Sequence, residues 1–120
     1  MLRALIVDDD VHMRFLVRLT IEVANEGLSV SGEADSGPAA ILAVEQDRPE
    51  VIVLDHWMPG MSGLETARRI LADNPEQRIL LFSAALDDAT IAAAHEAGIT
   101  ECLPKTEIEH LPETLRRVGA

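Results

Sequence analysis

Short apolar runs alternate along the chain with longer segments in which apolar residues recur at helical spacing. Residues 51–54 are apolar at every position and residues 78–82 nearly so, as expected of strands that are covered on both faces. Residues 2–8 end in acidic positions, and residues 100–103 form a short last run. Residues 28–34 alternate between apolar and polar side chains, which predicts a half-exposed edge strand. The pattern therefore predicts five strands.

Helical spacing fills the segments between these strands. Residues 11–24 place five apolar side chains near one helical face, namely Val11, Phe15, Leu16, Leu19 and Val23. Ser36 can cap a second helix that has Pro38 in its first turn and ends near residues 48–49. Further helices are predicted over residues 64–73, 87–97 and 112–118. The last begins at Pro112, because proline fits the first turn of a helix and breaks its interior.

Strands that alternate with helices predict an α/β fold, with a parallel sheet, right-handed crossovers and helices on both faces. Ligands of such sheets bind at the carboxyl ends of the strands. In a sheet of order 2-1-3-4-5, four adjacent strands bring polar side chains to one edge. These side chains are Asp8, Asp9, Asp55, Ser83 and Lys105.

Composition narrows the class of protein. The 120 residues are enough for one domain with its own core, and 48% of them are hydrophobic. Cys102 is the only cysteine, so an internal disulfide is impossible. Residues 4–7 are too short an apolar run for a signal peptide or a membrane span. The net charge of −11 argues against direct contact with nucleic acid or an anionic membrane. We therefore expect a soluble, cytoplasmic protein.

Three acidic residues at one edge of the sheet repel one another, so their clustering indicates a bound cation or a chemical role. Asp8, Asp9 and Asp55 offer hard oxygen ligands, which suit Mg²⁺. Without a cation, mutual repulsion raises the pKa of one carboxylate. The simpler alternative is a set of solvated loop acids that cap the first helix, and Asp10 is expected to point away from the other three.

The other polar groups at this edge suit phosphoryl chemistry. Asp55 can act as a carboxylate nucleophile toward phosphorus. The Ser83 hydroxyl can donate to a phosphoryl oxygen, and the Lys105 ammonium can meet a phosphate as a point charge. Each has a plainer alternative: Asp55 caps the following loop, Ser83 bonds local backbone, and Lys105 is a surface lysine.

Four motifs in register resemble the receiver domain of two-component response regulators. They are "LIVDDD" at residues 5–10, "LDHWMPGMSGLE" at 54–65, "LFSA" at 81–84 and "AGITECLPK" at 97–105. The resemblance covers essentially the whole chain. It implies a single flavodoxin-like receiver domain over residues 1–120 that acts as a signalling switch and is not an enzyme.

The resemblance also implies roles for the residues at the edge. Asp55 would accept a phosphoryl group from a sensor histidine kinase, and Ser83 and Lys105 would contact that group. Mg²⁺ would be held by Asp8, Asp9, Asp55 and the backbone carbonyl of Trp57. The first helix, around residues 12–19, would dock the kinase. The fourth helix, fifth strand and fifth helix would form the output face toward an output domain or partner protein, and could support a symmetric homodimer.

The chain departs from the family pattern in several places. Cys102 stands where an aromatic residue usually turns inward on activation. Thr106 follows the lysine in place of proline, so we expect a trans Lys105–Thr106 bond. Trp57 lies two positions after Asp55, where it could shield a hydrolytic water and slow self-dephosphorylation. The segments at residues 30–37 and 61–71 are more typical of receivers joined to helix-turn-helix output domains, which suggests transcription regulation; a free-standing receiver is the alternative.

Three other functions compete with the phosphorylated switch. A receiver fold could act as an interaction scaffold with little or no phosphorylation, which Cys102 and Thr106 keep open. An aspartate-nucleophile phosphatase lacks a second carboxylate two residues after Asp55 to act as general acid. A flavin-binding protein is disfavoured because three carboxylates after the first strand would repel a phosphate.

Overall fold

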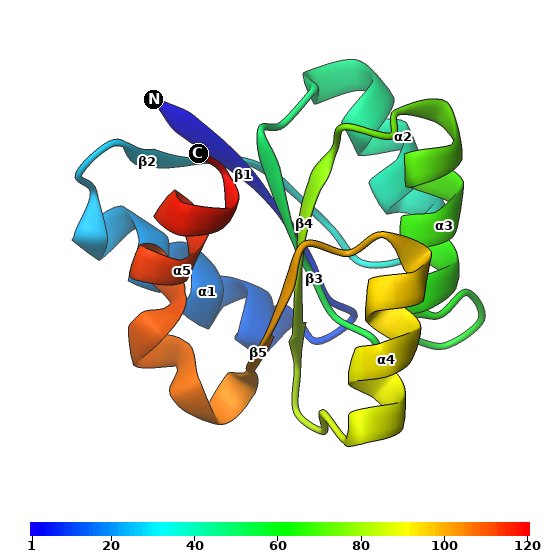
Figure 1. The fold of residues 1–120 in the computed structure, drawn as a ribbon. Coiled ribbons are helices and arrows are strands. Elements are labelled where there is room, and N and C mark those ends of the chain that lie inside the picture. Colours follow the sequence, from blue (N-terminus) through cyan, green and yellow to red (C-terminus); the bar gives the residue numbers. More distant parts are fainter.

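The computed structural model describes residues 1–120 as a five-stranded sheet between two layers of helices (Figure 1). The strands are β1 (Leu2–Val7), β2 (Leu28–Ala34), β3 (Val51–Leu54), β4 (Arg78–Ser83) and β5 (Glu101–Pro104). The helices are α1 (Val11–Ala24), α2 (Gly37–Asp47), α3 (Gly63–Asp73), α4 (Asp88–Ala97) and α5 (Leu111–Val118). A 3₁₀ helix, Lys105–His110, joins β5 to α5.

The sheet is parallel throughout and has the order β2-β1-β3-β4-β5, as the sequence predicts. β3 lies between β1 and β4, and all four of its residues are buried, which explains its uninterrupted apolar run. β2 is an edge strand, also as predicted. Its pairing with β1 shifts register between Ala4 and Leu5, so its exposure does not alternate cleanly.

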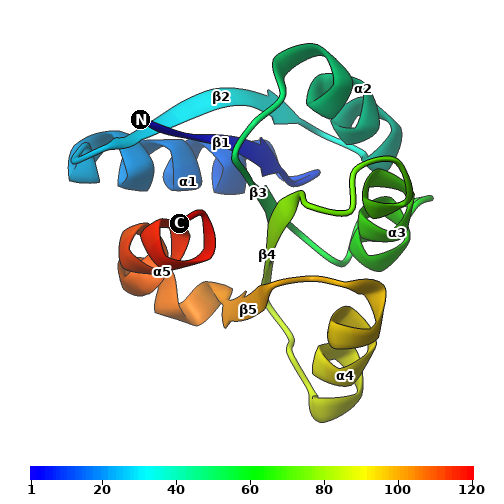
Figure 2. The same cartoon turned by 45° about the horizontal axis from the view of Figure 1, so that its top comes forward.

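Two apolar clusters hold the layers together. One lies under α1 and α5, and includes Val17 and Ile21 of α1 and Leu111 and Leu115 of α5. The other lies under α2, α3 and α4 on the opposite face of the sheet. Figure 2 shows this division, with α1 and α5 together and the other three helices on the far side. Because strand side chains alternate between faces, β1, β3 and β4 contribute to both clusters.

Local signals in the sequence set the helix boundaries. Four helices begin after a side chain that accepts a hydrogen bond from the first turn, and these caps are Asp10, Ser36, Ser62 and Asp87. Gly98 ends α4 in the left-handed conformation at a φ of 95°. α5 begins one residue before the predicted start and has Pro112 in its first turn. No peptide bond is cis, so Lys105–Thr106 is trans as expected.

The apolar face that the sequence marks on α1 is turned away from the sheet. The side chains packed in the core are Val17 and Ile21, on the other side of the helix. Phe15 is 65% exposed and Val23 is 76% exposed. The helix therefore has two apolar sides, of which the sheet covers only one.

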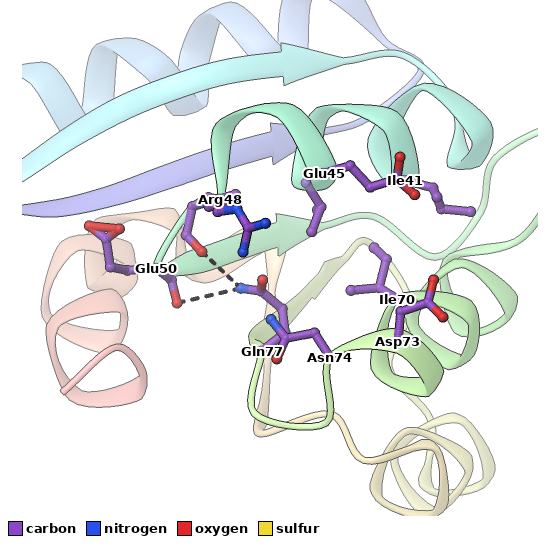
Figure 3. Close-up of a pocket in the computed structure, with 10 residues that line it drawn as sticks. Ile41, Glu45, Arg48, Glu50, Ile70, Asp73, Asn74 and Gln77 are labelled. Atoms are coloured by element: carbon purple, nitrogen blue, oxygen red, sulfur yellow. Dashed lines mark hydrogen bonds between the residues drawn. The ribbon is translucent and has the colours of Figure 1, made fainter.

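A cavity of about 470 Å³ lies between the C-terminal ends of α2 and α3 (Figure 3). Ile41, Val44 and Ile70 supply its apolar lining. The buried Gln77 amide lies beside it and donates to the carbonyls of Pro49 and Glu50. The cavity precedes β3 and β4, so it lies at the opposite end of these strands from Asp55. None of the helices has the length and apolar character needed to cross a membrane.

Candidate functional site

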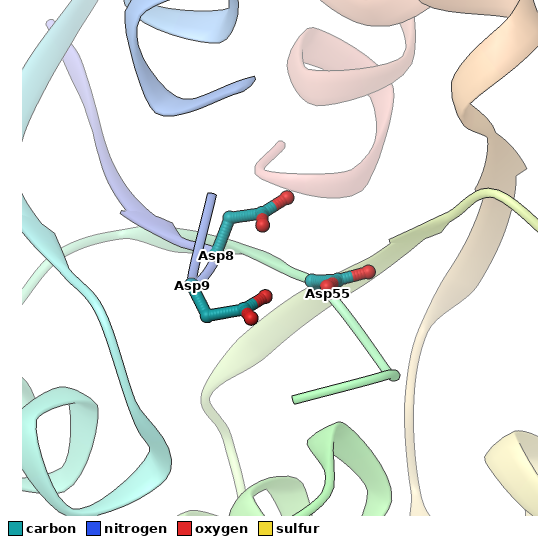
Figure 4. A group of neighbouring side chains, drawn as sticks. All are labelled: Asp8, Asp9 and Asp55. Carbon is teal, nitrogen blue, oxygen red and sulfur yellow. The ribbon is translucent and has the colours of Figure 1, made fainter. Parts of the chain in front are cut away.

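Asp8, Asp9 and Asp55 meet at the carboxyl ends of β1 and β3, which are adjacent strands paired through Val7 and Leu54. One carboxylate oxygen of each acid lies within 4.8 Å of the others. Figure 4 shows the three side chains projecting to the same side of the chain. Asp8 and Asp55 are 3% and 5% exposed, whereas Asp9 is exposed. Residues 47 positions apart in the sequence, Asp8 and Asp55, thus share one acidic cluster.

Lys105 joins this cluster from the end of β5. Its Nζ lies 2.7 Å from Asp8 Oδ2 and 3.2 Å from Asp55 Oδ1. Three carboxylates and one ammonium group leave two negative charges, which one divalent cation would balance. The donor set is all oxygen, as Mg²⁺ prefers. The residues present therefore fit such an ion. Lys105 pairs with two carboxylates, so the alternative of an unattached surface lysine does not describe its contacts.

The pKa values of the buried pair follow from these contacts. Burial, and then the charge of Asp8, raise the pKa of Asp55, while Lys105 opposes the rise. Burial alone would lower the pKa of Lys105, but its hydrogen bond to Asp8 and the charges of Asp55 and Asp8 raise it overall. The lysine is therefore held as a cation beside the carboxylates.

Asp8 is held by hydrogen bonds to its side chain and to its backbone carbonyl. Its Oδ1 accepts from the N–H of Asp10 at 2.9 Å, and its carbonyl accepts from Arg14 Nη1 at 2.7 Å. Asp10 itself turns away from the cluster, as expected, and caps α1 by accepting from His12 N–H. Arg14 is in turn paired with Glu33 of β2 at 3.0 Å. The first acid is thus anchored to α1 and to the edge strand.

Ser83 is fully buried at the end of β4, and its Oγ has no hydrogen-bond partner. A buried hydroxyl without a partner is costly, because it loses water without a replacement. The alternative in which Ser83 bonds only local backbone does not describe this structure. Ser83 lies two residues beyond Leu81, which pairs with Leu54 immediately before Asp55. An oxygen-rich group held by Asp55 would suit this hydroxyl.

Sequence reasoning missed Gly63, which sets the loop after Asp55. A Cβ on this residue would lie 2.1 Å from the Asp55 carbonyl oxygen and 2.7 Å from the His56 Cα. Gly63 also donates its N–H to the His56 carbonyl at 2.8 Å. Only glycine allows α3 to begin this close to the strand end. The "MPGMSG" segment signalled a loop, but this contact depends on the folded path of the chain.

His56 and Trp57 follow Asp55 and pack on each other, with ring centroids 4.5 Å apart. His56 is buried and its Nδ1 has no partner. Burial, followed by the charge of Arg68, lowers the pKa of His56. Trp57 is 62% exposed.

Cys102 lies on β5 and packs against the cluster under α2, α3 and α4. It is half-buried, and burial raises the pKa of its thiol. A thiol with a raised pKa is a poor nucleophile, because the thiolate is the reactive form. Cys102 therefore packs as a small apolar side chain.

The fold and the acidic cluster at the carboxyl ends of the strands indicate the class of protein. The family model of the response regulator receiver domain matches residues 4–116, and the chain belongs to that family. The α/β fold and the sheet order inferred from the sequence are those of this family.

Known relatives and solved structures agree. The chain is 32% identical over 118 residues to the chemotaxis protein CheY of Thermotoga maritima, covering 98% of this chain and 97% of that protein. It is 29% identical over 122 residues to the response regulator GacA of Pseudomonas aeruginosa, covering 100% of this chain. A LuxR-family two-component response regulator from Aurantimonas sp. SI85-9A1 superposes with a TM-score of 0.93 at 28% identity, covering 98% of this chain and 84% of that one.

These relatives differ in how much of their length the chain matches. The chain spans almost all of CheY, but only 56% of GacA. The shared part is therefore the receiver domain, a signalling domain, and the remainder of GacA lies outside the match.

Proposed function

We propose that this receiver domain is a phosphorylation-dependent switch in which Asp55 accepts a phosphoryl group from a sensor histidine kinase. The observation that carries the proposal is the cluster of Asp8, Asp9, Asp55 and Lys105 at the carboxyl ends of the strands. Family membership supports the same function, because receiver domains of response regulators interact with histidine kinases and output domains.

The proposed reaction is the transfer of a phosphoryl group between two nucleophiles. An Asp55 carboxylate oxygen attacks phosphorus and forms an O–P bond, while the N–P bond to the kinase histidine breaks and its electron pair returns to the imidazole. The product is an acyl phosphate. Lys105 supports the ionised form of Asp55 because its ammonium lies 3.2 Å from the attacking carboxylate.

Mg²⁺ is the cofactor that the donor set suits. Asp8, Asp9, Asp55 and the backbone carbonyl of Trp57 would hold it, and when bound it would neutralise negative charge on the transferring group. The two unbalanced charges of the cluster support this assignment, as does the general binding of Mg²⁺ by receiver domains.

Ser83 and Lys105 would read the phosphorylated state. The unpartnered Ser83 hydroxyl would donate to a phosphoryl oxygen, and Lys105 would exchange one carboxylate partner for the phosphoryl group. The change then shifts the population of two packings of the α4–β5–α5 face. Because Cys102 is too small to act as the usual aromatic reporter, the shift would depend on the β4–α4 segment and on β5 itself. Output to transcription is the more specific form of this proposal, suggested by the similarity to GacA and LuxR-family proteins.

Phosphotransfer to wild type and to Asp55→Asn tests the proposal. We expect wild-type protein with Mg²⁺ and a small phosphodonor to gain the mass of one phosphoryl group as a hydroxylamine-sensitive acyl phosphate. The Asp55→Asn variant should gain none. Asp73→Asn is the matched control, because Asp73 is exposed at the other end of the sheet and should be phosphorylated like wild type.

Phosphotransfer together with Trp57 fluorescence distinguishes the switch from the alternative of an interaction scaffold. Trp57 is the only tryptophan and lies two residues from Asp55, so its fluorescence should change with Mg²⁺ and with beryllofluoride. A wild-type protein that gains no phosphoryl group and shows no fluorescence change would favour the scaffold over the switch.

A further inference from the structure

The cavity between the C-terminal ends of α2 and α3 has the size and the mixed lining of a small-molecule site (Figure 3). We call it the α2–α3 cavity. Its volume of about 470 Å³ lies in the range of roughly 300–1,000 Å³ that holds small ligands. Ile41, Val44 and Ile70 form an apolar wall beside the polar residues that line the rest. The phosphoryl chemistry proposed for Asp55 uses the other end of the strands and leaves this cavity without a role.

Gln77 supplies the cavity with a fixed hydrogen-bond acceptor. This residue is 6% exposed, and its Nε2 donates to the carbonyls of Pro49, Glu50 and Arg78 at 3.2–3.5 Å. These three carbonyls settle which atom of the amide is the nitrogen. No protein group donates to Gln77 Oε1, which is the accessible end of an otherwise buried amide. A ligand in the cavity can therefore donate to an acceptor that the fold holds in place.

The two helices beside the cavity both end at it. α2 ends at Asp47 and α3 at Asp73, and Figure 3 shows the two helix ends on either side of the labelled side chains. The last carbonyls of a helix carry the negative end of its dipole. Neither helix has a basic residue in its last turn to offset that charge. The backbone alone therefore gives the cavity a negative electrostatic potential.

Charged side chains at the opening of the cavity reinforce this potential. Glu45 and Asp73 are exposed and form no ion pair, whereas Glu50 is paired with Arg3 at 3.5 Å. Arg48 is the one cation that lines the cavity. Two free carboxylates, two helix C-termini and one free amide oxygen thus outweigh one guanidinium group, and the balance favours a positively charged ligand.

We propose that the α2–α3 cavity binds a small organic cation, namely a protonated primary amine on a compact hydrocarbon body. The hydrocarbon would pack on the apolar wall, and the ammonium group would donate to Gln77 Oε1 within the field of the free carboxylates. An ammonium group has three donors and no acceptor, which suits a lining rich in acceptors. A metal cation would gain nothing from the apolar wall. Ligands of this size bind weakly, and we expect a dissociation constant on the order of 1 mM.

NMR titration of the nitrogen-15-labelled chain with cyclohexylmethylamine tests the proposal. Cyclohexylmethanol and cyclohexanecarboxylate are the matched ligands, because they carry the same ring with a neutral and a negative group. We expect saturable shifts at residues 41–50 and 70–77, including the side-chain amide of Gln77, and none around Asp55. The amine should bind at least tenfold more tightly than the alcohol, and the carboxylate should not saturate. Absence of saturable shifts with the amine, or equal binding of amine and alcohol, would overturn the proposal.

Charge variants at the opening of the cavity make predictions of opposite sign. Glu45→Gln and Asp73→Asn should each weaken binding of the amine about threefold, and Arg48→Gln should strengthen it by a similar factor. Glu109→Gln is the matched control, because it removes an exposed charge from the 3₁₀ helix that precedes α5, and it should bind like wild type. Effects of the reverse sign would show that the cavity selects anions, which contradicts the proposal.

Filling the cavity tests the location of the ligand. Val44→Phe should abolish saturable binding, whereas Leu42→Phe, at an exposed position of α2, should leave it unchanged. Circular dichroism establishes that each variant is folded, and Ile41→Phe replaces Val44→Phe if that variant is not. A folded Val44→Phe chain that binds the amine like wild type would place the ligand elsewhere and overturn the proposal. Asp55→Asn should bind like wild type, so failure of the proposed phosphorylation would leave this test intact.

Discussion

The helices α1 and α4 differ in the apolar side chains that they expose and in how many of their residues are buried. α1 has Val17 and Ile21 fully buried beneath it and carries five exposed apolar residues on its outer side. α4 has only Ala94 buried, and none of the exposed large hydrophobic residues lies on α4, β5 or α5. A firmly packed helix with exposed apolar side chains suits binding, whereas a lightly packed helix opens more readily. From this difference we expect α4 to be more mobile than α1.

Truncating the buried contact of each helix gives the largest expected effect. Ile21→Ala should lower the free energy of unfolding by about 3 kcal/mol, because it leaves a cavity beneath α1. Ala94→Gly should lower it by about 1 kcal/mol, mostly through helix propensity. Urea unfolding at low micromolar protein measures both. Val23→Ala on the outer side of α1 is the control and should change the value by less than about 0.5 kcal/mol. Equal losses for Ile21→Ala and Ala94→Gly would break the comparison.

Hydrogen exchange of backbone amides gives the next largest effect. Amides around Val17 and Ile21 should exchange about a hundredfold more slowly than those of residues 92–94, because α4 opens at a smaller free-energy cost. Exchange measured by mass spectrometry or NMR at neutral pH resolves the two helices. Similar protection would mean that α4 is as firmly attached as α1.

The smallest effect concerns the ion pairs that tie α1 to the edge strand. Glu33 of β2 accepts from Arg14 Nε at 3.0 Å and Arg18 Nε at 2.7 Å. The hydrogen bond from Arg18 is the main cause that lowers the pKa of Glu33; burial opposes it and Arg14 reinforces it. A lowered folded-state pKa means that the pairs stabilise the fold above the ordinary pKa of glutamate, and that this stability is lost as the pH falls through the folded value.

Glu33→Gln should therefore lower the free energy of unfolding by about 1 kcal/mol at pH 7, a value limited by the partial exposure of the pair. The difference from wild type should vanish in strongly acidic solution. Glu65→Gln, which removes the exposed pair with Arg69 inside α3, is the control and should cost about 0.3 kcal/mol. A pH-independent effect of Glu33→Gln would show that packing, and not charge, anchors α1.

The comparison of the two helices also marks where sequence reasoning succeeds. Capping residues such as Ser36 and breakers such as Pro112 act locally, so the α-helix boundaries follow from the sequence to within one or two residues. The 3₁₀ helix at Lys105–His110 was not predicted. The doubly apolar run of β3 predicts a central strand because only a central strand is covered on both faces. The acids at the strand ends meet because parallel strands share one edge, so their convergence follows from topology.

What the sequence leaves open depends on contacts between distant segments. α1 has two apolar sides, and periodicity does not say which one the sheet covers; the choice of Val17 and Ile21 follows from the position of α5 and β1. The requirement for glycine at position 63 depends on how closely α3 approaches the backbone of Asp55 and His56. The register shift between Ala4 and Leu5 likewise depends on how β2 lies against β1.

The bridge from Lys105 to Asp8 and Asp55 has a mechanical consequence. The Lys105 ammonium group links the end of β5 to the ends of β1 and β3, so its ion pairs connect three strands at their carboxyl ends. A ligand that binds those carboxylate oxygens must displace the Lys105 ammonium group. The 3₁₀ helix that begins at Lys105 would then be less constrained. Electrostatic competition for a few carboxylate oxygens would thereby loosen the chain near β5 and α5, where no large hydrophobic side chain is exposed.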